Sequence, residues 1–414
     1  MKPVFGIHIG NTNVTLAICK DNDHPEIVAN DAGDRITPAM VTVTDSEIIV
    51  GAAAKSATMS QLQTTISSNK TMMEMKVKLC EKFQDQMVLR NNEVYYSLTL
   101  GEKIKYVSPQ QIATYILKKL YETAKNTINS KEEQVSCVLL ASVHSSDEFC
   151  EKYRTAAEDA GWTVLQIINE PAAAVLAYSL LDTVTPPQTL LVYRLGDTTC
   201  EVTAYNLTDG MLFVLGSEHS EELGGCHFTK TLLEYFTAEF FRKYKLDIRE
   251  NRRSLAKLKL ASENCVHILS KMQAANCYIE SLHEGVDFNT TISRPQFELL
   301  TQPILAKLTV PMKQLLDRLQ LRKPVDTIVL CGGATNVPKL QSHITGLFNP
   351  DVTQVLTCPN ADELLALGAA KQAYNLVKHR VTEFLPRSQK IHFEVSALSD
   401  STSSESFTSD EENL

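Results

Sequence analysis

The sequence predicts a two-lobed α/β protein. Short apolar strands alternate with helical stretches along most of the chain, an order that is typical of sheets covered by helices. In addition, one pattern of strand, glycine turn and strand occurs twice, as "VFGIHIGNTNVTLAI" from residue 4 and as "LLVYRLGDTTCEVTAY" from residue 190. A hairpin repeated at the start of each half indicates two similar lobes. Two unrelated hairpins are the alternative.

The elements behind this prediction follow from the distribution of apolar residues. Short aliphatic and β-branched runs predict strands, and the longer segments between them predict helices. The predicted strands cover residues 3–10, 13–19, 40–44, 47–51, 135–141, 163–169, 189–195, 200–207, 211–217, 275–282 and 326–333. The predicted helices cover residues 109–128, 147–160, 171–181, 225–244, 251–271, 295–319, 338–347 and 361–376.

The composition favours an ordinary globular protein. The chain of 414 residues has 43% hydrophobic and 21% charged residues, which is typical of soluble globular proteins. Its net charge of −9 argues against a general nucleic-acid binder. No stretch approaches the roughly 20 apolar residues of a membrane span, and the N-terminus has no apolar core of a signal peptide. We therefore expect a protein of the cytoplasm without membrane contact.

The ten cysteines are scattered, and none forms a C-x-x-C pair. Several lie inside apolar runs such as "VSCVLLA". Buried free thiols in a reducing compartment are therefore predicted in preference to zinc sites or disulfides.

The last residues, 396–414, differ in character from the rest. The segment "SALSDSTSSESFTSDEENL" is rich in serine and acidic residues and contains no Lys or Arg. It buries too little apolar surface to order itself, so we predict a disordered acidic tail. The motif "TSDEE" resembles a site for an acidophilic kinase, and a merely solubilising tail is the preferred alternative.

Several stretches, in this order, resemble the nucleotide-binding domain of the DnaK-type heat-shock chaperones, in the actin–hexokinase superfamily. They are the hairpins at residues 6–12 and 195–199, "IINEPAAAVLAY" at 167–178, "IVLCGGATNVPKLQ" at 328–341 and "ADELLALGAA" after it. The resemblance extends from about residue 5 to about residue 377. It implies an actin-like nucleotide-binding domain over residues 1–380, with ATP or ADP in a cleft between lobe I, about 1–185, and lobe II, about 186–380.

The diverged hairpins resemble one branch of that family, the atypical ribosome-associated (Ssz-type) members that pair with a J-protein. This resemblance implies a J-domain co-chaperone as partner and an association with the ribosome or nascent chains. The family's peptide-binding β-sandwich should begin near residue 390, where "RSQKIHFEVSALSD" leads into the acidic tail. We expect a linker remnant at 381–395 and no peptide-binding domain, either natively or through truncation of the sequence.

Glycine turns in both hairpins predict phosphate cradles, because backbone N–H groups approach oxygen atoms closely where no Cβ intervenes. The glycine pair at 224 and 225 precedes a helix whose N-terminal dipole favours an anion. An ordinary structural turn is the alternative for each glycine. The predicted phosphate-binding residues are Gly10, Asn11, Thr12, Asn13, Arg194, Gly196, Asp197, Thr198, Thr199, Gly224 and Gly225.

The adenosine side of the site is expected after the buried strand "TIVLC", where two glycines allow close backbone approach to adenine or ribose. By resemblance, His267, Ala334 and Asn336 stand where the family has Arg, Ser and Arg. A smaller and mostly neutral ring replaces a stacking cation, so we expect weakened adenosine affinity. The predicted adenosine-binding residues are Glu263, His267, Gly332, Gly333, Ala334 and Asp362.

Two residues are predicted to be catalytic by resemblance. Lys76, in "TMMEMKVKLC", matches the family lysine that holds the terminal phosphate, although Lys78 leaves this ambiguous by two residues. A solvated helix lysine is the alternative. Glu170 and Pro171 match the family's acidic residue near the metal and its switch proline. An ordinary helix start, with an acid and a proline in its first turn, is the alternative.

The chain departs from the family pattern at the metal. His8 and Arg194 stand where the family has aspartates that hold Mg²⁺ and potassium, and Glu201 stands for a third. Asn11 and Leu140 replace threonines near the attacked phosphate. Because a cation shell assembles poorly around an arginine and an imidazole, we expect no metal site and very slow or absent hydrolysis. Arg194 and the predicted lysine are expected to neutralise the phosphates without a Mg²⁺ requirement.

Three functions are compatible with these residues. The first is an ATP-binding chaperone partner with a degenerate active site that assists protein folding with a J-protein. The second is an active, ATP-hydrolysing chaperone. The third is a nucleotide-free scaffold. A sugar kinase would share the fold, but the heat-shock-type stretches argue against it.

Overall fold

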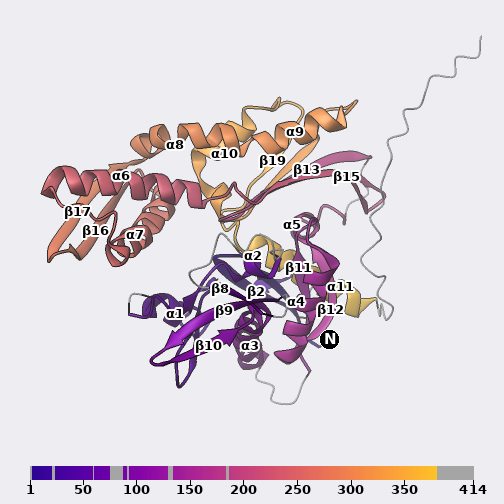
Figure 1. Cartoon of the computed structure of the whole chain (residues 1–414). Coiled ribbons are helices and arrows are strands. Elements are labelled where there is room, and N and C mark those ends of the chain that lie inside the picture. The colour runs from indigo at the N-terminus through magenta and orange to yellow at the C-terminus, as the bar shows by residue number, and fades with distance from the viewer. Residues whose placement is uncertain are drawn as a thin grey trace, which may run out of the picture.

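The computed structural model of the chain (Figure 1) describes residues 2–20, 24–58, 60–74, 87–90, 93–128, 134–182 and 186–379. Three of the predictions lie outside these ranges. They concern Lys76, the linker at 381–395 and the tail at 396–414.

Two sheets form the framework, and both have the same topology. In the first, β1 (Val4–Ile9) pairs antiparallel with β2 (Asn13–Cys19) and parallel with β11 (Ser136–Ala141). In the second, β13 (Gln188–Leu195) pairs in the same two ways with β14 (Cys200–Thr208) and β18 (Thr327–Cys331). Outer strands complete them: β3 (Glu26–Ile27), β4 (Thr37–Pro38) and β12 (Thr163–Asn169) in the first, β15 (Met211–Ser220) and β19 (Gln354–Leu356) in the second.

This duplication confirms the two-lobed α/β prediction (Figure 1). We use lobe I and lobe II for the parts built on the first and the second sheet. The predicted lobe boundaries stay a prediction, because helix α11 (Leu364–Lys378) follows the second sheet in the chain but packs against β1, β2 and β11 of the first.

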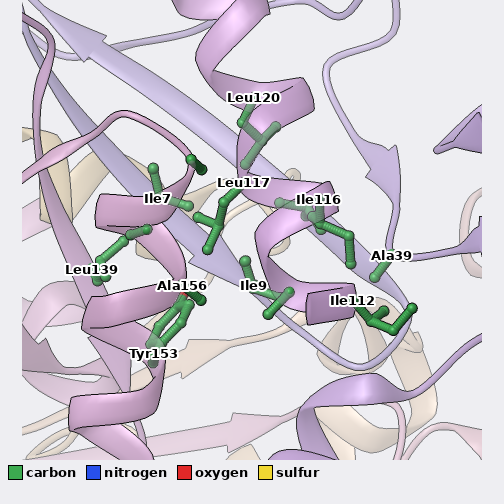
Figure 2. Packing of buried hydrophobic residues seen from close by; sticks show 14 of the residues in the cluster. Ile7, Ile9, Ala39, Ile112, Ile116, Leu117, Leu120, Leu139, Tyr153 and Ala156 are labelled. Atoms are coloured by element: carbon green, nitrogen blue, oxygen red, sulfur yellow. The ribbon is translucent and has the colours of Figure 1, made fainter. Parts of the chain in front are cut away.

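Each sheet buries a separate core on its outer face. Figure 2 shows Ile7 and Ile9 of β1 among side chains of α3 (Pro109–Ile128) and α4 (Asp147–Asp159), which cover the first sheet. Leu191 of β13 lies in a second core under the helices of lobe II. These outer-facing residues alternate with residues on the opposite face, as the period of a strand requires.

The inner faces of the two sheets share one helical layer, made of α5 (Glu170–Ala177) and α11. Val4 of β1 and Val192 of β13 both pack into this layer. Because side chains alternate along a strand, His8 and Arg194 lie on the same inner faces as these valines. Two residues nearly two hundred positions apart in sequence are thereby turned toward the same place between the sheets.

The close approach of α11 to its neighbours requires glycine. A Cβ on Gly368 would lie 1.8 Å from the backbone oxygen of Ala173 in α5, and a Cβ on Gly6 would lie 2.2 Å from the backbone nitrogen of Ala370. Both neighbours are backbone atoms, which side-chain rotation does not move. Helix α11 therefore packs against α5 and β1 with backbone atoms in direct contact.

Smaller elements flank the sheets on both lobes. In lobe I they are α1 (Ala52–Ala57), α2 (Asn69–Glu74), the sheet of β5 (Val41–Val43), β6 (Ile48–Val50) and β7 (Thr65–Ile66), and the sheet of β8 (Met87–Arg90), β9 (Glu93–Leu100) and β10 (Lys103–Val107). In lobe II they are α6 (Cys226–Tyr244), α7 (Arg252–Lys271), β16 (Ala274–His283), β17 (Val286–Ser293), α8 (Arg294–Leu308), α9 (Val310–Leu319), a 3-10 turn (Gly333–Asn336) and α10 (Pro338–Thr345).

All the strands predicted from the sequence are present, and most predicted helices match. The single helix predicted over 295–319 is wrong, because α8 and α9 separate at Thr309. Pro311 explains the break, since it has no N–H to donate to the preceding turn and restricts the residue before it. The prediction also missed the helices α1 and α2 and the strands β3, β4, β7, β8, β9, β10, β17 and β19.

Two further predictions concern cysteines and membranes. No two of the described cysteines form a disulfide with each other, and seven of the nine are buried, as predicted. None of the described helices combines the length and the apolar character that a bilayer-crossing segment needs.

We expect Gly368→Ala to lower the free energy of unfolding by about 3 kcal/mol, because the added methyl group forces two backbones apart. Urea denaturation measures this. Gly346→Ala is the control, since its added Cβ has 3.2 Å to the nearest atom. Equal stability of the two variants would contradict the backbone contact.

Candidate functional site

The turns of the two hairpins are built alike and meet tip to tip. Gly10 donates its N–H to the oxygen of Asn13 at 2.8 Å, and Gly196 donates to the oxygen of Thr199 at 2.9 Å. Between the turns, Asn11 Nδ2 donates to Thr198 Oγ1 at 2.7 Å. The two predicted phosphate cradles therefore lie next to each other, one from each lobe.

Asn11 is fixed from its other side by helix α2. Its Oδ1 accepts a hydrogen bond from the backbone N–H of Thr71 at 2.9 Å, and its backbone oxygen accepts one from Ser68 at 3.2 Å. The amide is therefore oriented with its NH₂ group toward lobe II. A threonine at this position would lack the second polar atom that makes both contacts.

The second cradle rests on the N-terminus of α6. The N–H of Gly225 donates to the oxygen of Gly196 at 2.9 Å, and the N–H of Cys226 donates to the oxygen of Asp197 at 2.8 Å. A Cβ on Gly224 would lie 2.1 Å from that same Asp197 oxygen. The glycine pair is thus needed for the turn to seat against the helix.

Two of the six predicted adenosine-binding residues, His267 and Asp362, line a cavity of about 280 Å³. Asn336 also lines it. Gly332 has a φ of +88°, and a Cβ on Gly333 would lie 2.2 Å from Asp362 Oδ1. The close neighbours of these two glycines are protein atoms, so their predicted approach to adenine or ribose stays a prediction. Ala334 lies against Gly225, and Glu263 lies one turn before His267 on α7.

A buried ion cluster lies between the sheets, where the resemblance placed metal-binding acids. The carboxylate of Glu170, at the start of α5, is fully buried. Its Oε2 lies 2.6 Å from Arg194 Nε, and its Oε1 lies 2.5 Å from Lys70 Nζ. His8 Nε2 lies 3.6 Å from Oε1. One carboxylate therefore binds two cations, one from each lobe.

Comparison with known proteins decides the family. The family model described as Hsp70 protein matches residues 4–390 of this chain. The curated relatives include "Heat shock 70 kDa protein 14" of Mus musculus, 36% identical over 90% of this chain and 74% of that protein. The Homo sapiens and Danio rerio proteins of the same name are 35% and 36% identical, over 90% of this chain and 74% and 75% of theirs. The chain belongs to the Hsp70 family.

Membership of the Hsp70 family accounts for the two lobes. The duplicated sheets with a shared helical layer are the actin-like fold of the family's nucleotide-binding domain. Hsp70 proteins bind ATP and ADP in this domain, act as chaperones, and generally work with J-domain co-chaperones and client proteins. The Lys70–Glu170–Arg194 cluster lies within this domain.

The charges in the cluster are set by burial and by pairing. Burial alone would raise the pKa of Glu170, but the charges of Arg194 and Lys70 hold that pKa well below its ordinary value. Burial lowers the pKa of His8, more than the neighbouring carboxylate raises it. At neutral pH the cluster therefore contains an ionised glutamate, two cations and an uncharged imidazole.

Glu201, which stands for a third family aspartate, has its pKa raised, whereas the pKa of Glu170 is lowered. It lies opposite Arg194 in the β13–β14 pair and is buried. Its Oε1 accepts a hydrogen bond from the N–H of Val143 at 3.1 Å. Burial raises the pKa of Glu201, and Arg194 offsets this only in part because it is already paired with Glu170.

The residues present fit a nucleotide. At Gly10 and Gly196 no Cβ stands between the turn backbone and a phosphate oxygen, which suits contact with backbone N–H groups. Within the described chain, Thr12 Oγ1 is buried in the first turn without a hydrogen-bond partner, which suits contact with a phosphate. The cavity at His267 is the corresponding space for a base or ribose.

The residues present do not fit a resident Mg²⁺. Mg²⁺ keeps several water ligands and is held in proteins through one or two carboxylates besides phosphates. The carboxylate of Glu170 is already bound by two cations, and Arg194 occupies the position of an acid. Across residues 2–379, apart from the undescribed gaps, no three His, Cys, Asp or Glu side chains group in a way that could hold a metal.

Lys70 is the member of the cluster that the sequence analysis missed. Lys70 is the second residue of α2, six residues before the predicted Lys76. Its place in the cluster is visible only in the fold, where it lies against Glu170. Arg194 was predicted to face phosphate, and in the structure its charge is balanced by Glu170, while its Nη1 donates to Thr199 Oγ1 at 3.2 Å. The phosphate-binding and catalytic roles stay predictions.

The two buried glutamates should respond in opposite ways to replacement by glutamine. Glu170→Gln leaves two buried cations without their partner and is expected to lower the free energy of unfolding by about 3–5 kcal/mol at pH 7. Because the folded-state pKa is depressed, this stabilisation is present above the unfolded pKa and is lost as pH falls through the folded value. Thermal denaturation at several pH values measures it.

Glu201→Gln is the matched variant and is expected to raise the free energy of unfolding. A carboxyl group whose pKa is raised in the folded state stabilises the fold below the unfolded pKa. This stabilisation is lost as pH rises through the folded-state pKa. The gain from glutamine should therefore be larger at pH 8 than at pH 5. A loss of stability that is equal at both pH values would show that Glu201 is held as a paired carboxylate instead.

Proposed function

We propose that this chain is an ATP-binding Hsp70-type chaperone component with a degenerate active site. It binds ATP or ADP without Mg²⁺, hydrolyses ATP very slowly or not at all, and assists protein folding with a J-domain partner at the ribosome. The observation that carries the proposal is the Lys70–Glu170–Arg194 cluster in the place of a metal site.

Phosphate binding in this proposal rests on backbone groups and one lysine. The N–H groups of both turns, apart from those of Gly10 and Gly196, and the hydroxyl of Thr12 supply hydrogen bonds. Arg194 and Glu170 balance each other, so Lys70 leaves the cluster with an excess of one positive charge. That excess attracts an anion and repels a divalent cation, since interactions between charges are strong where water is excluded. Arg194 acts here as a positioning residue.

Slow hydrolysis follows from the lack of a group to position or activate water. Phosphoryl transfer depends on a metal and on an oriented nucleophile. Glu170 is held by two cations, and the pKa of Glu201 is raised by burial. His8 is neutral, but it lies against Glu170. The rival proposal of an active chaperone ATPase would need a side chain other than these three in this role.

The partner in this proposal is a J-domain protein, and the site of action is the ribosome or nascent chains in the cytoplasm. The support is the family's general use of J-domain co-chaperones together with the resemblance of both hairpins to the Ssz-type branch. Lys76, which lies outside the described residues, keeps its proposed contact with the terminal phosphate. A nucleotide-free scaffold is the remaining rival.

Isothermal titration with ATP, with and without a chelator, tests metal-free binding. We expect the same affinity in both conditions. Lys70→Met should weaken it by about 1.5–3 kcal/mol, the range for a charge-assisted contact, which is roughly tenfold or more. Lys152→Met, at an exposed ion pair, is the control. Arg194→Asp should introduce a Mg²⁺ requirement.

Loss of ATP binding on chelation would overturn metal-free binding. No binding in either condition would support the scaffold.

Single-turnover assays with labelled ATP test hydrolysis. We expect a negligible rate beside a DnaK-type ATPase, with and without Mg²⁺, because neither water nor metal is positioned. A comparable rate that Lys76→Ala abolishes would establish the active-ATPase reading.

A further inference from the structure

Side chains of both lobes meet at two points near the hairpins. Between the sheets, Lys70 from α2 of lobe I and Arg194 from β13 of lobe II bind the same Glu170 carboxylate. At the hairpin tips, Asn11 of lobe I donates to Thr198 of lobe II. We call the Lys70–Glu170–Arg194 cluster and the Asn11–Thr198 hydrogen bond the interlobe latch.

We propose that the interlobe latch holds the two lobes together without a nucleotide, so that ATP or ADP leaves the arrangement of the lobes unchanged. This inference goes beyond the proposed function and does not depend on whether the site binds a nucleotide. It concerns what joins the lobes, whereas the proposed function concerns what the site binds.

The burial of the cluster makes it suited to this role. The side chains of Lys70, Glu170 and Arg194 are 10%, 0% and 7% exposed. Water therefore competes little for these charges, and their attraction is strong. Separation of the lobes would withdraw Arg194 from Glu170, and until water enters the gap these buried charges would lack partners, which is strongly unfavourable.

A second set of contacts crosses between the lobes beside the latch. The loop after β11 of lobe I donates the N–H of Val143 to Glu201 on β14 of lobe II, at 3.1 Å. In the next residue, the ring of His144 stacks on His219 of β15, with centroids 3.9 Å apart, and its Nε2 lies 3.0 Å from Ser217 Oγ. Opening of the lobes has to break these contacts together with the latch.

A ligand moves a conformational equilibrium only by its differential affinity for the two states. When the joined state already dominates without a ligand, the further change that binding can produce is small. A chain with a built-in latch should therefore bind a nucleotide without using it as a conformational signal. An Hsp70 chain that lacks these contacts would depend on its nucleotide to join the lobes.

Hydrogen exchange at the Val143 amide tests the proposal, because its acceptor lies on the other lobe. The full chain is measured in chelator, alone and with saturating ATP or ADP, against a denatured control. We expect strong protection without nucleotide and a change of less than about twofold on its addition. Arg194→Met should raise the exchange rate about tenfold or more, and Arg249→Met, at an exposed ion pair of lobe II, should not.

Protection that appears only with nucleotide would overturn the proposal, and so would an unchanged rate in Arg194→Met. Thr198→Val, which removes only the hydroxyl that Asn11 binds, covers the case in which Arg194→Met fails to fold. It should also raise the rate, and no change in a folded Thr198→Val protein would overturn the latch. Absence of ATP binding in titration would remove the proposed function and leave this test intact.

Discussion

The carboxylate of Glu170 is the group on which the rest of the site depends. It is fully buried at the junction of β12 and α5, and a buried carboxylate without partners is strongly unfavourable. Arg194 from one lobe and Lys70 from the other supply the partners. The burial of each cation is likewise tolerated only because the carboxylate is there. The three residues thus form a unit that neither lobe completes alone.

The geometry of the strands brings this unit together. Side chains alternate along β1 and β13, so His8 and Arg194 face the inner layer while their neighbours face the outer cores. Within that layer, α11 packs closely against β1 and α5 only because Gly6 and Gly368 allow backbone contact. Arg194 at the end of β13 has Glu201 opposite it on β14, but its ion pair is with Glu170, which the position of α5 brings within reach.

Much of this architecture was accessible from the sequence, because it depends on local patterns. The strand at 189–195 and the glycine turn after it follow from residues within a few positions of each other, and so do the paired glycines at 332 and 333. The strands of the sheet of β8, β9 and β10 were missed since their exposed faces interrupt the apolar runs. The break at Thr309 depends on one proline that a helical pattern alone ignores.

Lys70 could not be predicted in the same way. Nothing within its own segment, "SSNKTMM", distinguishes it from any solvated lysine, and its partner is one hundred residues away. The sequence shows that Arg194 adds positive charge, and its hairpin predicts that this charge faces phosphate. That Glu170 balances the charge depends on the fold. The sequence can indicate which charges are present at a site, but only the fold determines which of them are already paired and which is left for a ligand. Here Lys70, which the motif did not include, binds the same carboxylate as Arg194.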